Sequence, residues 1–152
     1  MNDIALIWDN ANGRADFAIA GGDLQMDPGL GTSLIISYFC DRVADRSDKI
    51  PDGGTDPRGW WGDTPAPGAT VDGAGINLTG SKLWLASKLQ VPETLVQMRA
   101  FCLQATRWYV ADGIARQVVP TVTFPARGWT LISTAIFQSD VPSVYDLAWS
   151  AT

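Results

Sequence analysis

A stretch of turn-forming residues between Ser47 and Gly80 constrains this 152-residue chain more than any other feature. Its 34 residues include eight glycines, four prolines and five aspartates, a composition that excludes a long helix or strand. We expect a long loop there, either ordered or a flexible insertion. The adjacent indoles of Trp60 and Trp61 favour order around them, because a disordered linker has little use for such side chains. Mobility is expected instead between Pro65 and Gly75.

Before this loop, the sequence predicts a β-hairpin followed by one helix. Apolar residues alternate with others from Ile4 to Trp8, and the Asn12-Gly13 turn leads into a second short strand around Phe17 to Ala20. Apolar residues then recur at helical spacing after Thr32 and Ser33, which predicts a helix over about Gly31 to Ala44.

After the loop, two helices are expected. Ser81 is suited to cap a short helix, and Pro92 suits the first turn of a longer helix that runs to about Ala111. The longer helix carries two apolar stripes, one formed by Leu95, Met98, Cys102, Ala105 and Tyr109 and the next by Val96, Leu103 and Val110. Two stripes predict an unusually wide buried face, and therefore a central core helix.

The C-terminal part reads as a three-stranded meander. The first strand alternates around Val118 to Phe124, the second runs from Trp129 to Phe137, and the third covers about Ser143 to Ser150. Pro120 and Pro142 are expected at an edge or a bulge. The chain is therefore predicted to be one α+β domain spanning 1–152, with a small antiparallel sheet packed on about three helices.

The composition argues against several classes of function. The formal charge of −5, with scattered basic residues, argues against a nucleic-acid-binding face. The absence of histidine excludes Ser-His-Asp and Cys-His catalysis as well as every His-ligated metal site. The apolar runs are too short to cross a membrane, and the N-terminus lacks the pattern of a signal peptide, so we expect a protein made and kept in the cytosol. Cys40 and Cys102 read as small buried hydrophobes, and no cofactor is indicated.

The sequence contains few candidates for the carboxylates of general acid–base catalysis. Glu93 is the single glutamate, and Asp56 and Asp63 flank the tryptophan pair, where a carboxylate beside indoles suits a sugar subsite. Aspartates in such loops more often form turns or pair with a nearby arginine. We expect Arg58 to pair with Asp41, Asp45 or Asp63 and so fix the loop against the end of the first helix.

Several short motifs together resemble one known family. They are Gly22-Asp23-Leu24, Thr32 to Ser37, Asp41-Arg42-Val43-Ala44, Ile50 to Gly53, Arg58-Gly59-Trp60-Trp61-Gly62-Asp63, Gly80 to Leu85 and Trp108 to Ala115. This series resembles the small baseplate protein of Mu-like contractile phages, over nearly the whole chain. That family is similar to the tail sheath initiators, which share a fold with a baseplate wedge protein once described as a lysozyme.

The resemblance implies a structural role without catalysis or cofactors. Six copies would surround the tail tube, contact the baseplate wedge proteins and possibly tube or hub proteins, and offer a template for the first ring of tail sheath. The residues themselves suggest how, because an outer strand of the predicted meander has unpaired N–H and C=O groups that a partner strand can satisfy by augmentation. The chain would lie in the virion baseplate after assembly in the host cytoplasm, bound to neither nucleic acid nor membrane. The candidate structural or interface residues are Asp41, Arg42, Arg58, Trp60, Trp61, Asp63, Trp84, Tyr145, Leu147 and Trp149.

Two other functions stay open at this point. One is a peptidoglycan-cleaving glycosidase of the tail, suggested by the acidic loop with its tryptophans and by the old lysozyme label on related proteins. The other is a small soluble adaptor, since α+β domains of this size also serve as binding modules.

Overall fold

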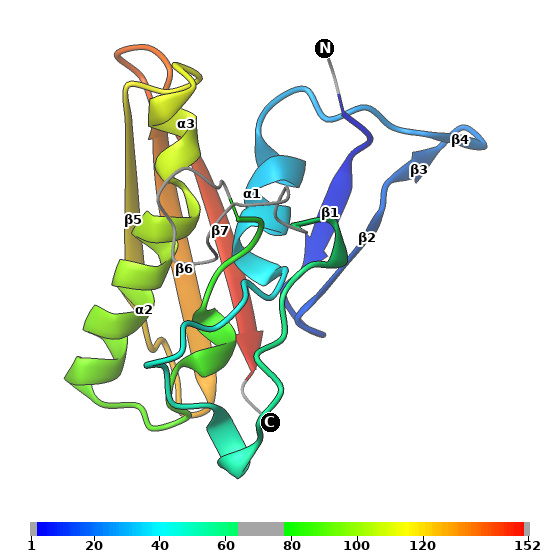
Figure 1. Ribbon diagram of the computed structural model, residues 1–152. Helices are drawn as coiled ribbons and strands as arrows, with labels where there is room; N and C mark the ends of the chain where they lie inside the picture. The colour runs from blue at the N-terminus through cyan, green and yellow to red at the C-terminus, as the bar shows by residue number, and fades with distance from the viewer. Residues whose placement is uncertain (1–2, 64–77, 151–152) are drawn as a thin grey trace.

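A computed structural model describes residues 3–63 and 78–150. Its largest element is a three-stranded antiparallel sheet in the order β5-β6-β7, formed by β5 (Gln117–Thr123), β6 (Trp129–Phe137) and β7 (Ser143–Ser150). Helices lie against one face of this sheet, and two small hairpins extend from the side of β7 (Figure 1). The predicted α+β class and the C-terminal meander are confirmed. The segment expected to be mobile, Pro65 to Gly75, lies outside the described residues.

The N-terminal hairpin is confirmed, with a shift of its second strand. β1 (Leu6–Asp9) pairs with β2 (Arg14–Phe17), so the second strand ends where the sequence pattern suggested it would begin. A further hairpin, β3 (Ile19–Ala20) with β4 (Asp23–Leu24), was not expected. Gly21 and Gly22 connect its strands with φ of +62° and +85°, the positive values that a tight two-residue hairpin turn requires.

The first helix is shorter than predicted. α1 covers Gly31–Phe39 rather than reaching Ala44, because Cys40 turns into an extended conformation and the chain beyond it pairs with a distant segment. No hydroxyl side chain caps its start. Instead, Asp27 Oδ2 accepts a hydrogen bond from the Thr32 N–H at 2.7 Å, while the Thr32 hydroxyl donates to the Ile4 carbonyl and ties α1 to the N-terminal strand.

The long helix expected from Pro92 to Ala111 is interrupted. α2 (Pro92–Ala105) and α3 (Arg107–Ala111) meet at Thr106, whose hydroxyl donates to the Cys102 carbonyl at 2.8 Å. Such a side-chain bond competes with the regular helix ladder and often bends a helix. Three single-turn 3₁₀ segments, Pro51–Gly53, Trp61–Asp63 and Leu83–Leu85, lie in the connections, the last of them replacing the short helix predicted after Ser81.

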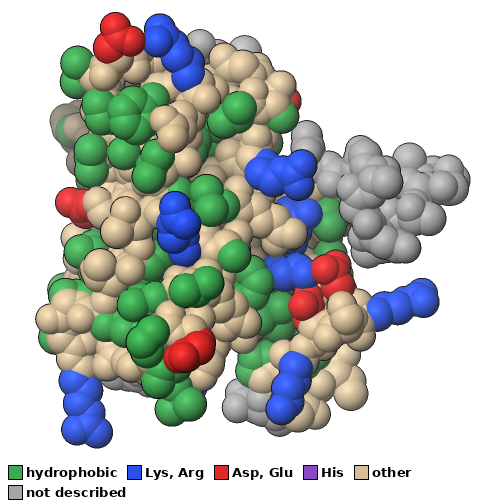
Figure 2. All heavy atoms as spheres, turned by 90° about the vertical axis from the view of Figure 1, so that its left-hand side faces the viewer, with side chains coloured by type: hydrophobic (Ala, Val, Ile, Leu, Met, Phe, Trp, Pro, Cys, Tyr) green, Lys and Arg blue, Asp and Glu red, His purple; other side chains and the backbone are tan. Residues whose placement is uncertain are grey.

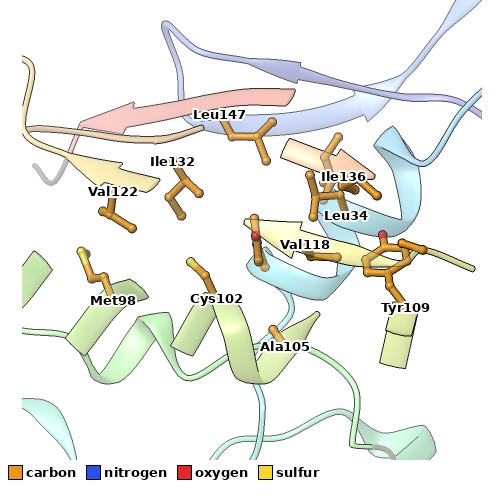
Figure 3. Close-up of a cluster of buried hydrophobic side chains, with 13 residues drawn as sticks. Leu34, Met98, Cys102, Ala105, Tyr109, Val118, Val122, Ile132, Ile136 and Leu147 are labelled. Atoms are coloured by element: carbon orange, nitrogen blue, oxygen red, sulfur yellow. The ribbon is translucent and has the colours of Figure 1, made fainter. Parts of the chain in front are cut away.

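The core lies between the sheet and the helices. β6 alternates strictly, and its buried side chains include Ile132 and Ile136. Figure 3 shows Val122, Ile132 and Leu147 of the sheet above Met98 and Cys102 of α2. The first apolar stripe of the long helix is therefore in the core, apart from the half-buried Leu95.

The second stripe is not buried, so the prediction of a wide buried face is wrong. Val96, Leu103 and Val110 are all exposed. A helix that covers one face of a three-stranded sheet needs only one stripe against it, and in the described residues no further layer lies over the outer side of α2 (Figure 1). Pro120 lies in β5, at the edge of the sheet as predicted.

No helix among the described residues has the length and apolar character that crossing a bilayer requires. The core also contains paired polar groups, and Tyr38 and Thr134 are a buried pair of this kind. Their hydroxyls are 2.9 Å apart and join α1 to β6.

We predict that Tyr38→Phe lowers the free energy of unfolding by about 1–3 kcal/mol, because the Thr134 hydroxyl is left buried without its partner. Tyr109→Phe is the matched control. It removes an equally buried hydroxyl, but Ser33 keeps its bond to the Leu30 carbonyl, so the loss is smaller. Urea denaturation of both variants measures the difference, and equal losses would contradict this account.

Candidate functional site

The chain leaves α1 and returns beside it after nearly forty residues. Arg42 N–H donates to the Ser81 carbonyl, and Ser81 N–H donates to the Cys40 carbonyl, each at 2.9 Å, as in two parallel strands. Gly80, at φ +87°, permits this contact, because a Cβ at that position would lie 2.2 Å from the Cys40 oxygen. The end of α1 and the segment around Trp84 are thereby held side by side.

Arg58 lies across this junction. Its Nη1 is 2.8 Å from Asp41 Oδ2, and its guanidinium carbon lies 4.5 Å from the centre of the Trp84 ring. The Trp84 Nε1–H donates to the Arg42 carbonyl at 2.9 Å, which fixes the indole beneath the arginine. The backbone of Arg58 has φ +52°, a value that costs free energy in a residue with a side chain.

The expected pairing of Arg58 is confirmed with Asp41, the first of its three candidate partners. The pair is not buried: the two side chains are 50% and 42% exposed. An ion pair in contact with water contributes little to folding, so much of the binding capacity of this guanidinium is open to another molecule.

Asp63 has a different partner. Its two carboxylate oxygens accept hydrogen bonds from the N–H and the hydroxyl of Thr79, at 2.7 and 2.9 Å. Arg42 Nη1 donates to the neighbouring Leu78 carbonyl at 3.0 Å, and burial lowers the pKa of this arginine. Arg42 therefore fastens the returning chain to the segment after α1, and Asp63 fastens it to the turn at Trp61–Asp63.

Trp60 and Trp61 lie at the surface of this region. Their ring centres are 5.3 Å apart, and Trp61 is the more exposed of the two. Gly62 leaves room for the Trp60 ring, since a Cβ there would lie 2.2 Å from the indole. The pair thus forms an ordered aromatic surface, as the sequence suggested for this part of the loop.

A buried lysine beside this surface was missed by the sequence analysis. Lys82 Nζ contacts Asp45 Oδ2 at 2.5 Å and Asp48 Oδ2 at 2.6 Å, while its side chain is only 6% exposed. Burial opposes the charge, but the hydrogen bonds to the two carboxylates outweigh it and raise the pKa of Lys82. The pKa of Asp48 falls, since its bonds to the lysine and to the Asp45 N–H outweigh the effect of burial.

The three predicted residues of the C-terminal strand face the domain. Leu147 is in the core, and the Tyr145 hydroxyl accepts the Leu30 N–H at 3.0 Å near the start of α1. Trp149 lies edge-on to Phe39, with ring centres 5.4 Å apart. These side chains therefore position β7 and leave its backbone edge as the part available for contact.

That outer edge of β7 is capped at one end. The Ala148 N–H donates to Asn10 Oδ1, and the Ala148 carbonyl accepts the Trp8 Nε1–H, both at 2.8 Å. Backbone groups of alternate residues point away from the neighbouring strand, so Val144 and Asp146 face the same side as Ala148. In the described part of the chain, no comparable cap covers these two positions.

A groove lies among the residues of the 83–90 segment, α2, the turn between β5 and β6 and the end of β7. It has a volume of about 610 Å³ and is lined by Leu83, Trp84, Ala86, Ser87, Lys88, Leu89, Gln90, Met98, Phe124, Arg127, Gly128, Thr130 and Trp149. The two charged residues of this lining, Lys88 and Arg127, are both basic. The groove is therefore an apolar hollow with a positive rim.

The described residues contain no group of three or more histidine, cysteine or carboxylate side chains that could hold a metal ion. Asp56 Oδ1 accepts the Arg58 N–H at 2.9 Å, which is the turn role expected for such an aspartate. Burial raises the pKa of the Cys102 thiol to about 12, so this cysteine behaves as a core residue, and Cys40 is only partly buried.

Comparison with known proteins identifies relatives over most of the chain. The family described as Phage protein GP46 matches residues 30–142. The chain is 36% identical over 141 residues to "Baseplate protein gp46" of Escherichia phage Mu, an alignment that covers 92% of this chain and 90% of the relative. It is 32% identical over 141 residues, with the same coverage, to "Mu-like prophage FluMu protein gp46" of Haemophilus influenzae.

We predict that Arg58→Ala changes the free energy of unfolding by at most about 1 kcal/mol, because its ion pair is solvated. Lys82→Met should cost roughly 2 kcal/mol, since it removes two charged hydrogen bonds at a buried nitrogen. Arg116→Ala, in the exposed pair with Asp140, is the control and should cause no measurable shift. Thermal melts at pH 7 rank the three variants, and a larger loss for Arg58→Ala than for Lys82→Met would refute the assignment.

Proposed function

The chain belongs to the phage protein GP46 family, and from this membership we propose how it acts within a phage baseplate. It is a structural protein of a Mu-like phage baseplate, and so a part of the virion tail. In our proposal it links the baseplate wedge and tube to the contractile sheath, and its sheet templates the first ring of sheath subunits. Six copies act in each baseplate, after assembly in the host cytoplasm.

The observation that carries this proposal is the uncapped edge of β7. A sheet edge with unsatisfied N–H and C=O groups is a template for a strand from another chain. Asn10 and Trp8 occupy the backbone groups of Ala148, so the template is confined to the part of β7 around Val144 and Asp146. A sheath strand added there would continue the β5-β6-β7 sheet by one strand.

The second contact that we assign is the Arg58 surface, made of Arg58 with its support Trp84 and the neighbouring Trp60 and Trp61. Arginine and tryptophan are the residues most enriched at the energetic centres of protein interfaces. This surface is built from the segment around Arg58 and from Trp84 rather than from the free part of β7, and we assign it to a second partner, the wedge proteins. The side chains of Asp41 and Asp63 hold it in place.

Among the described residues, the three carboxylates considered for a glycosidase give that function no support. Such an enzyme needs one carboxyl group kept protonated beside a second that is charged. Asp63 is held by Thr79 and Asp56 by the Arg58 N–H, while Glu93 is exposed in the first turn of α2. A soluble adaptor function would also use the Arg58 surface, but it does not account for the membership of this chain in a baseplate protein family.

We predict that proline at Val144 or Asp146 blocks sheath assembly without unfolding the protein. Neither N–H is directed towards β6, so proline removes the template and spares the ladder. At least one of these variants should fold, enter the baseplate and fail to start the sheath. The measurements are a thermal melt and the extension of sheath on purified baseplates.

Ala148→Pro serves as the control for this test, because it removes an internal hydrogen bond to Asn10 and should therefore lower the melting temperature. If every variant that folds still starts a full-length sheath, the template lies on another edge, such as that of the N-terminal hairpin.

A further inference from the structure

The β3–β4 hairpin projects from the side of the molecule (Figure 1), and several of its apolar side chains are exposed. Ile19 and Leu24 form its cross-strand pair and are 71% and 45% exposed. Phe17 and Met26, next to the hairpin on either side, are also exposed. Backbone hydrogen bonds join the base of this hairpin to the N-terminal segment, since the Ala5 N–H donates to the Gln25 carbonyl and the Ala18 N–H donates to the Ala5 carbonyl. The apolar side chains themselves stay exposed among the described residues, and a patch of this kind is typical of a contact surface for another molecule.

Negative charge is concentrated in the same part of the chain. Residues 1–30 contain five aspartates and one arginine, and so account for −4 of the total formal charge of −5. Asp23 belongs to the hairpin itself and Asp16 to the adjoining strand, and both are exposed. The occupant of this surface should therefore combine apolar side chains with basic ones.

The groove described above has this combination. Leu89 at its rim is 68% exposed, and Lys88 and Arg127 supply positive charge. The side of the molecule that carries α2 likewise shows Lys and Arg side chains among apolar ones (Figure 2). The volume of the groove lies in the range of pockets that hold a compact ligand, so the groove has room for the apolar side chains of a two-residue hairpin.

We propose that the β3–β4 hairpin of one copy docks in this groove of the next copy. Ile19 and Leu24 enter the apolar hollow, and Asp23 lies near Lys88 and Arg127 at its rim. The hairpin projects from the N-terminal part of the chain (Figure 1), whereas the groove is lined by residues of the 83–90 segment, α2, the turn between β5 and β6 and the end of β7, so the two surfaces come from different parts of the chain. The contact is therefore head to tail, a kind that closes into a ring when the rotation between neighbours allows it.

The charge distribution favours a second copy over another occupant. One chain carries both halves of the contact, an acidic apolar projection and a basic apolar groove. This contact shares Trp84 with the Arg58 surface but is separate from the template edge of β7 around Val144 and Asp146. Its failure and the failure of sheath templating are therefore distinguishable, because one is read from links between copies and the other from sheath length.

The test is a chain in which the partly buried native cysteine is removed by Cys40→Ala, as in every variant of this test, and in which Ile19→Cys and Leu89→Cys are introduced together or singly. Purified protein and tails isolated from phage bearing each variant are oxidised mildly and separated without reductant. We expect a ladder of disulfide-linked dimers, trimers and higher species, since each doubly substituted chain offers one cysteine on each surface. Either single variant should give dimers at most, and the ladder should weaken as salt screens the charges.

Ile19→Cys with Val141→Cys is the matched control, because Val141 is 79% exposed but lies in the turn between β6 and β7, away from the groove. A ladder in tails, with or without one in the purified protein, supports the proposal when the control gives none. Monomers in the tails overturn it, as does a disulfide that links the Ile19→Cys position to a different baseplate protein. If the variant forms no tails, Asp23→Cys with Lys88→Cys replaces it, and monomers in the purified protein then overturn the proposal.

Discussion

The structure depends on one close backbone contact, between Gly80 and the end of α1. No side chain fits between Gly80 and the Cys40 carbonyl, and that contact lets Ser81 pair with the backbone on either side of Asp41. Closing a loop of this length costs conformational entropy, which the buried Lys82 and the Asp63–Thr79 bonds help to offset. The Arg58 surface exists because these contacts bring two distant segments together.

The parts of the fold that follow from local pattern were predictable. Strands β5, β6 and β7 alternate between buried and exposed faces, and the sequence placed each of them within a few residues. The end of α1 was not predictable. The residues from Asp41 to Ala44 continue the helical pattern in the sequence, and they leave the helix only because Asp41 pairs with Ser81. Likewise, nothing in the periodicity of the long helix separates the stripe that the sheet covers from the stripe that it leaves exposed.

The candidate site divides in the same way. The aromatic surface of Trp60 and Trp61 could be predicted because the two residues are neighbours in the sequence. The Arg58–Asp41 bond could be predicted from the opposite charges and from the position of Asp41 near the expected end of the first helix. Lys82 was missed because its two carboxylate partners are more than thirty residues away. The caps on Ala148 were missed for a related reason. In the sequence Asn10 looks like an ordinary turn residue of the N-terminal hairpin, and only the packing of that hairpin against β7 brings its side chain to Ala148.

Exposed apolar and aromatic side chains occur at the hairpin, the groove and the Arg58 surface as well as on the outer stripe of the long helix, while the core is closed around α1, α2 and the sheet. A reconstruction of the tail by electron cryomicroscopy that resolves strands at the junction of baseplate and sheath tests this account most directly. We expect a strand of the first sheath ring beside Val144 and Asp146, ending before Ala148, where Asn10 and Trp8 remain bound. A β7 edge facing solvent or the tube, with the first sheath ring attached elsewhere, would contradict it.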